Sequence, residues 1–271
     1  MIDLSKLIKY YLDKGISYQY ALARVSQDII LSKISLSKYS KNVTIKGGLV
    51  MFNITNDKRR STIDIDISFI KYSLFDTSIK MFFEQFLLND YDGIILKIIS
   101  IKELKHESYR GKRVIIDIMD NFNNIIKTKI DIGIENKDIP QDNAIFNFEC
   151  IEKSLNLKIN SREQIFTEKL ISIIRHNIST TRYKDFYDIY FLIRERKMNS
   201  NKILQLFETY DINKYLQTTN FNSISQLIKE TLESKNVILG IESKNWLDIS
   251  TSELLNTITT YLDEITYNIV S

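Results

Sequence analysis

The chain has 271 residues, of which 44% are hydrophobic and 26% charged, and its formal net charge is +3, as in an ordinary globular protein of one or two domains. Its single cysteine excludes an internal disulfide, and its two histidines are too few for a zinc cluster. No stretch reads as a signal peptide or is long enough to cross a membrane, so we expect a cytoplasmic protein without a membrane partner.

The N-terminal part predicts two helices and carries most of the positive charge. Apolar residues recur at helical spacing over residues 2–14 and 18–36, so we expect two amphipathic helices that pack beneath a sheet. Residues 1–60 hold eleven Lys and Arg against four Asp, a net charge of +7, whereas residues 232–271 have a net charge of −4. Such asymmetry indicates an anionic partner or, equally well, a solvated lysine-rich surface.

Residues 43–52 predict a short strand, the pair Gly47-Gly48 and a turn of apolar residues. Paired glycines let a backbone approach a ligand closely, and the free N–H groups at the start of a helix favour phosphate. A tight turn is the alternative interpretation of the glycines taken alone. Lys46, directly before them, would add positive charge next to a bound phosphate.

Residues 62–69 alternate strictly between polar and apolar side chains, which predicts a strand with one buried face. Asp64 and Asp66 would share the open face, roughly 6 to 7 Å apart. At an effective dielectric constant of about 20 the two carboxylates repel each other by about 2 to 3 kcal/mol, a cost that a divalent cation would remove. A solvated strand face is the alternative, but the nearby glycine pair favours a site for phosphate and metal.

The middle of the chain predicts a third helix over residues 75–87 and strands over 93–101, 112–119 and 126–134. Phe75 is expected in the apolar stripe of that helix. In the last strand, Asp131 shares the polar face with Lys127 and Lys129. The preceding strand carries Asp117.

From residue 161 the pattern becomes helical and stays so. A capping box at Ser161–Gln164 starts a helix in which Lys169 lies off the apolar stripe, where an ordinary surface lysine is the simpler interpretation. The next helix, residues 184–196, has Asp185 and Asp188 on one polar face, a pair that the helix dipole by itself would explain. A further helix over residues 250–269 shows no sign of chemistry.

Taken together, these motifs resemble the AbiEii/AbiGii abortive-infection toxins of the DNA polymerase β-like nucleotidyltransferase superfamily. The resemblance covers roughly residues 43–195 and rests on three strings: Gly47-Gly48, Arg60-x-Thr62-x-Asp64-x-Asp66, and Lys169 with RYKDFYDIY from Arg182. Many members of the superfamily have Gly-Ser at the glycine motif. Here Leu49 follows the glycines, so no hydroxyl from that position can bind a phosphate.

The resemblance implies an α+β fold, with a mixed sheet flanked by helices in a nucleotidyltransferase domain (residues 1–155) and an all-helical C-terminal domain (156–271). It also implies a third acid on a strand adjacent to Asp64 and Asp66. Asp131 fits this role better than Asp117, which shares its face with Ile115 and Met119. The three acids would bind two Mg²⁺ or Mn²⁺ ions, as in other two-metal sites.

By resemblance, Lys169 and Asp185 join Asp64, Asp66 and Asp131 as catalytic residues. The expected nucleotide-binding residues are Lys46, Gly47, Gly48, Arg60, Thr62, Lys169 and Asp188. The implied activity is the transfer of a nucleotide from a nucleoside triphosphate to an acceptor, with the 3′ end of tRNA expected, in a toxin that has a possible cognate antitoxin. A degenerate binding module and a metal-dependent nuclease are the alternatives.

Overall fold

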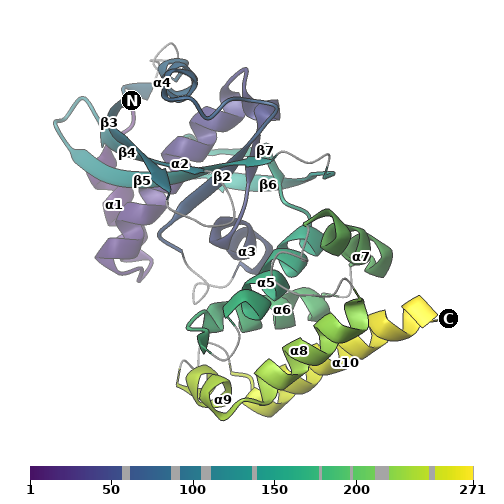
Figure 1. Ribbon diagram of the computed structural model, residues 1–271. Coiled ribbons are helices and arrows are strands. Elements are labelled where there is room, and N and C mark those ends of the chain that lie inside the picture. Colours follow the sequence, from purple (N-terminus) through teal and green to yellow (C-terminus); the bar gives the residue numbers. More distant parts are fainter. Residues whose placement is uncertain are drawn as a thin grey trace. The chain divides into compact units, whose positions relative to one another are not determined.

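The computed structural model describes residues 1–56, 62–86, 92–104, 111–135, 139–176, 179–195, 198–210, 220–243 and 248–270. It divides into two compact units, residues 1–160 and 161–271 (Figure 1). The first unit holds a mixed sheet with flanking helices, and the described part of the second is helical. The expected fold class is confirmed. The division between the two units falls after residue 160, so that β7 (Lys153–Ile159) stays with the sheet.

Within the described residues, the sheet has seven strands in the order β3-β4-β5-β2-β1-β7-β6. Two pairs are parallel, β2 with β5 and β1 with β7, and the other neighbours are antiparallel. The remaining strands are β1 (Val43–Ile45), β2 (Ile65–Ile70), β3 (Ile95–Leu104), β4 (Gly111–Met119), β5 (Ile125–Glu135) and β6 (Asp142–Phe148). The β6–β7 hairpin was not predicted. In β6 the apolar residues Ala144, Ile145 and Phe146 are consecutive, and the exposed Ile145 hides the alternation.

The helices of the first unit are α1 (Leu4–Asp13), α2 (Tyr18–Leu36), α3 (Gly48–Thr55) and α4 (Asp76–Glu84). As expected, the long helix α2 packs against the sheet, on β5, β6 and β7 (Figure 1). It is buried almost throughout residues 25–34, because one helix covers several strands. At α4, the Phe82 ring lies 5.0 Å from that of Phe69 in β2. The prediction for Phe75 is wrong: this residue precedes α4 and is 76% exposed.

The second unit contains α5 (Arg162–His176), α6 (Tyr183–Arg194), α7 (Ser200–Thr209), α8 (Phe221–Glu233), α9 (Lys235–Glu242) and α10 (Thr251–Val270). The predicted cap of α5 is present, since Ser161 Oγ accepts a hydrogen bond from the Gln164 N–H at 3.2 Å. α10 begins in the same way, with Ser250 Oγ accepting from the Glu253 N–H at 3.1 Å. Among the described residues, no helix is both long and apolar enough to cross a membrane.

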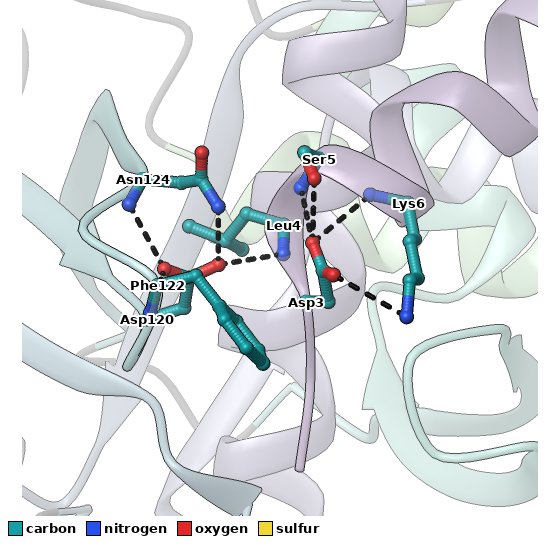
Figure 2. A network of polar contacts seen from close by, with 7 residues as sticks. All are labelled: Asp3, Leu4, Ser5, Lys6, Asp120, Phe122 and Asn124. Carbon is teal, nitrogen blue, oxygen red and sulfur yellow. Dashed lines mark hydrogen bonds and ion pairs between the residues drawn. The ribbon is translucent and has the colours of Figure 1, made fainter.

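The Asp120 carboxylate links the start of α1 to the turn between β4 and β5 (Figure 2). It accepts hydrogen bonds of 2.9 Å from the backbone N–H groups of Leu4, Phe122 and Asn124, and one of 2.8 Å from Asn124 Nδ2. Burial by itself raises the pKa of Asp120, but these hydrogen bonds outweigh it, so the pKa is lowered. The ionised carboxylate therefore stabilises the fold.

We predict that Asp120→Asn lowers the free energy of unfolding at pH 7 by about 1 to 3 kcal/mol, because an amide cannot accept all four hydrogen bonds. A carboxylate whose pKa is lowered by folding stabilises the native state above its unfolded pKa of about 3.9 and loses this effect as the pH falls through the native pKa. The difference between wild type and variant should therefore shrink when urea unfolding is measured from pH 7 down to pH ~3.

The control is Asp13→Asn, which removes an exposed carboxylate that pairs with Lys9 within α1. Such an exposed pair contributes little, so its loss should change the unfolding free energy by no more than about 0.5 kcal/mol. An Asp120→Asn variant as stable as wild type at pH 7 would mean that these hydrogen bonds do not hold the turn.

Candidate active site

The predicted alternation around β2 produces one apolar and one charged face. Ile65, Ile67 and Phe69 are buried to 1% exposure or less. Asp64, directly before the strand, and Asp66 within it project from the opposite face, as expected for a period of two. The sequence thus predicted the orientation of both carboxylates.

Strand register lines up charged residues from neighbouring strands across this face. Asp66 of β2 pairs with Asp131 of β5, and Asp131 pairs with Arg113 of β4. On the other side, the backbone N–H of Lys46 donates to the Asp66 carbonyl at 3.1 Å. Neighbouring strands therefore carry Arg113, Asp131, Asp66 and Lys46 in one row, and Asp131 lies on the strand adjacent to Asp66, where a third acid was expected.

Asp117 lies on the same face of β4 but farther along the strand than Arg113. Its neighbours in register are Lys97 of β3 and Lys127 of β5, not Asp66. The structure therefore brings Asp131, and not Asp117, next to Asp66.

Two of the three carboxylates already have a basic partner. Asp131 accepts two hydrogen bonds from Arg113, from Nε to Oδ1 and from Nη2 to Oδ2, both at 2.7 Å. Asp64 lies 2.8 Å from Lys129 Nζ, and its side chain remains 51% exposed. The sequence motifs alone give no reason to pair these residues, since the partners come from different segments of the chain.

Asp66 differs from its two neighbours. Burial raises its pKa to about 6, and the charges of Asp64 and Asp131 act in the same direction, while Lys46 and Lys129 oppose them. The ionised form of Asp66 is therefore compensated only in part by the protein. An added cation would supply the missing positive charge.

The glycine pair leaves room for two side chains of the site. A Cβ on Gly47, which has φ +66°, would lie 2.8 Å from Asp66 Oδ2, and one on Gly48 would lie 2.8 Å from Thr62 Oγ1. The Thr62 carbonyl accepts a hydrogen bond of 2.9 Å from Gln27 Nε2 of α2. Gly47 also precedes α3 and offers no capping side chain, so the first N–H groups of α3 have no side-chain cap there.

Gly133 of β5 has a comparable role on the same face. A Cβ at this position would lie 3.0 Å from Lys46 Nζ. The missing side chain lets the Lys46 ammonium extend across β2 toward β5, on the side of the sheet that carries Asp66 and Asp131. Lys46 therefore reaches the charged row with its side chain as well as its backbone.

In the second unit, Lys169 of α5 lies between two acids of α6. Its Nζ is 2.7 Å from Asp185 Oδ1 and 2.6 Å from Asp188 Oδ2. The three side chains are 11%, 8% and 1% exposed, in that order, and Arg182 adds an ion pair to Asp185 at 3.0 Å. Lys169 is thus not an ordinary surface lysine, and the acid pair does more than stabilise a helix terminus.

The donor set suits a divalent cation only in part. Asp64 and Asp66 offer carboxylate oxygens, the ligands that Mg²⁺ and Mn²⁺ prefer. Both oxygens of Asp131, however, accept hydrogen bonds from Arg113. No group of three or more His, Cys, Asp or Glu side chains suited to a metal ion is found in the described part of the chain.

Arg60 lies outside the described residues. The residues that sequence reasoning missed are Arg113, Lys129 as the partner of Asp64, and Gln27. The sequence shows these residue types and predicts that Lys129 shares a face with Asp131. It does not show which strands are neighbours. Only strand register brings these side chains to the site.

Comparisons with known proteins identify the family and a similar fold. The model of the nucleotidyl transferase AbiEii toxin family, type IV toxin–antitoxin system, matches residues 29–256. A solved structure of MenT4, a nucleotidyltransferase toxin from Mycobacterium tuberculosis H37Rv, is similar in fold, with a TM-score of 0.50 and 13% sequence identity over 98% of each chain. No curated protein gives a significant sequence match. Because the family match extends over most of the chain, this protein belongs to the AbiEii nucleotidyltransferase toxin family.

Proposed function

We propose that this nucleotidyltransferase toxin transfers a nucleotide from a nucleoside triphosphate to the 3′ end of tRNA, which blocks translation. The observation that carries the proposal is the position of the Asp66 carboxylate, incompletely compensated and directly against Gly47. Nucleotidyl transfer requires a backbone turn that can bind phosphate beside carboxylates that can bind a divalent cation.

In this proposal Asp64 and Asp66 hold a divalent cation, Mg²⁺ or Mn²⁺. When bound, the cation would neutralise charge on the phosphates and on the attacking oxygen. A second cation, expected from the sequence, would need Asp131 as a ligand, and Asp131 is bonded to Arg113 through both oxygens. The geometry therefore supports the first cation better than the second.

Other residues of the chain bind and orient the nucleotide. Gly47, Gly48 and the uncapped N–H groups of α3 offer donors to the phosphates, and Lys46 adds positive charge beside them. Thr62, held by Gln27, fixes the chain that leads into β2. Positioning of this kind, together with charge stabilisation, supplies most of the catalysis in phosphoryl and nucleotidyl transfer.

Lys169 contributes a cation to the nucleotide phosphates, as the family resemblance implies. Asp188 is 1% exposed and bonds to Lys169, so we assign it to orienting that lysine rather than to direct nucleotide contact. Asp185, paired with both Lys169 and Arg182, shares this orienting role and, from the resemblance, takes part in catalysis.

The proposed tRNA acceptor is supported by the charge of the N-terminal part, and the proposed antitoxin partner by the family. The net charge of +7 over residues 1–60 is suited to a polyanion such as tRNA. Membership of a type IV toxin–antitoxin family implies a cognate antitoxin.

The two alternatives give different products in one assay. Incubation of the protein with radiolabelled nucleoside triphosphates, Mg²⁺ and total tRNA should yield labelled RNA. Unlabelled, intact RNA would favour a degenerate binding module, and shortened RNA would favour a nuclease.

We predict that Asp66→Asn abolishes transfer and at the same time stabilises the metal-free protein. Folding raises the pKa of this carboxyl from 3.8 to about 6, so its ionised form destabilises the native state above that pH. At about 1.4 kcal/mol per pH unit, the variant should gain up to about 3 kcal/mol in unfolding free energy at pH 7 in a chelating buffer.

The matched variant is Asp64→Asn. Asp64 is half exposed and pairs with Lys129, so transfer should be lost without the gain in stability. Transfer at a near wild-type rate by either variant would contradict the assignment of the cation ligands.

We also predict that Lys169→Ala lowers kcat/KM for the nucleotide by roughly 100-fold, as the loss of one phosphate-stabilising group does elsewhere. Because it leaves Asp185 and Asp188 buried without their lysine, it should also cost about 3 to 5 kcal/mol of stability in urea unfolding. Lys153→Ala, at an exposed position of β7, is the control and should stay within about 0.5 kcal/mol of wild type. If Lys169→Ala has the stability and activity of wild type, Lys169 neither binds the nucleotide nor compensates the two buried acids.

A further inference from the structure

Arg113 lies in the charged row of the sheet, between Asp131 of β5 and Lys102 of β3. Its guanidinium holds Asp131 with two hydrogen bonds of 2.7 Å, and Asp131 is the register neighbour of Asp66. The Arg113 side chain is 40% exposed, whereas that of Asp131 is 21% exposed. The guanidinium therefore stays open to solvent on the face that carries the proposed cation ligands.

We propose that Arg113 takes the place of a second metal ion, so that each chain binds one divalent cation, at Asp64 and Asp66. The proposal rests on the proposed function and deepens it. Asp131 then serves as the residue that positions the guanidinium and not as a metal ligand.

Charge balance supports this assignment. Around Asp66, the described part of this face carries the carboxylates of Asp64, Asp66 and Asp131 and the cations of Lys46, Arg113 and Lys129, and Lys102 of β3 lies beside Arg113 in register. A second divalent ion at Asp131 would compete with the positive charge of a bidentate guanidinium, which is among the strongest carboxylate partners in proteins. Among the described residues, the first ion has to loosen the ion pair between Lys129 and Asp64.

The chemistry of the guanidinium also fits. Arginine stays protonated at every physiological pH, and the hydrogen bonds from Arg113 to Asp131 raise its pKa further. Binding through Nε and Nη2 engages two of its five N–H groups, and the others can donate to an anion such as a phosphate. A permanent positive charge held in this way can stabilise phosphate charge without a metal.

The competing interpretation is a structural salt bridge between two strands. A partly exposed pair of this kind contributes modestly to stability, so its loss would leave the fold of the sheet unchanged. The two interpretations differ in metal stoichiometry. If the Arg113 guanidinium keeps a metal ion away from Asp131, its removal will create a second ion site. If the pair is only structural, the number of bound ions will not change.

The test is titration of the full-length protein with Mn²⁺ alone, in which electron paramagnetic resonance measures free Mn²⁺ and so gives the number of ions bound. The wild type should bind one Mn²⁺ per chain, and Arg113→Ala should bind two. The double variant Arg113→Ala/Asp131→Asn should return to one, and Asp66→Asn should bind none. Lys127→Ala, which removes an exposed cation from the same face of β5, should remain at one. Circular dichroism checks that each variant is folded.

A wild-type stoichiometry other than one, or an Arg113→Ala variant that stays at one, would overturn the inference. The labelled-nucleotide assay separates this failure from that of the proposed function. Two bound ions together with nucleotide transfer would overturn the role of Arg113 alone. One bound ion without any transfer, under all nucleotides and with total tRNA, would leave the single-ion site standing and remove the proposed function.

Discussion

The parallel pairing of β2 with β5 is the interaction on which the charged face of the sheet depends. In-register parallel strands place side chains of equal parity next to each other, so Asp66 and Asp131 become neighbours. The β4–β5 hairpin then adds Arg113, and β1 adds Lys46. A slip of one residue would turn the carboxylates into the core, and the buried isoleucines of β2 and β5 oppose such a slip.

Three carboxylates on one face repel each other, and the fold compensates them unequally. Asp64 and Asp131 each have a basic side chain within 2.8 Å. Asp66 is half-buried, and this burial raises its pKa to about 6. The least compensated carboxylate is thus the one against Gly47, which is consistent with a site that gives up stability in order to bind a cation and phosphates.

In the second unit, by contrast, the buried charges are paired with one another. Lys169, Asp185 and Asp188 are all nearly buried and compensate one another through short ion pairs. Burial of charges is costly, and such a cluster persists only when its geometry is good. The two acids hold the ammonium group of Lys169 in place, so this side chain has a fixed orientation that a mobile surface lysine lacks.

The sequence by itself determined the local structure and the family. Periodicity predicted the faces of the strands at residues 62–69 and 126–134 and the helices α1 and α2, because it depends only on neighbouring residues. The strings around Gly47, Asp64, Lys169 and Arg182 carried the family resemblance. The tertiary structure decided the β6–β7 hairpin, the boundary at residue 160, the bond between Arg113 and Asp131 and the burial of Lys169. These features depend on strand order, register and packing between distant segments, which local patterns do not encode.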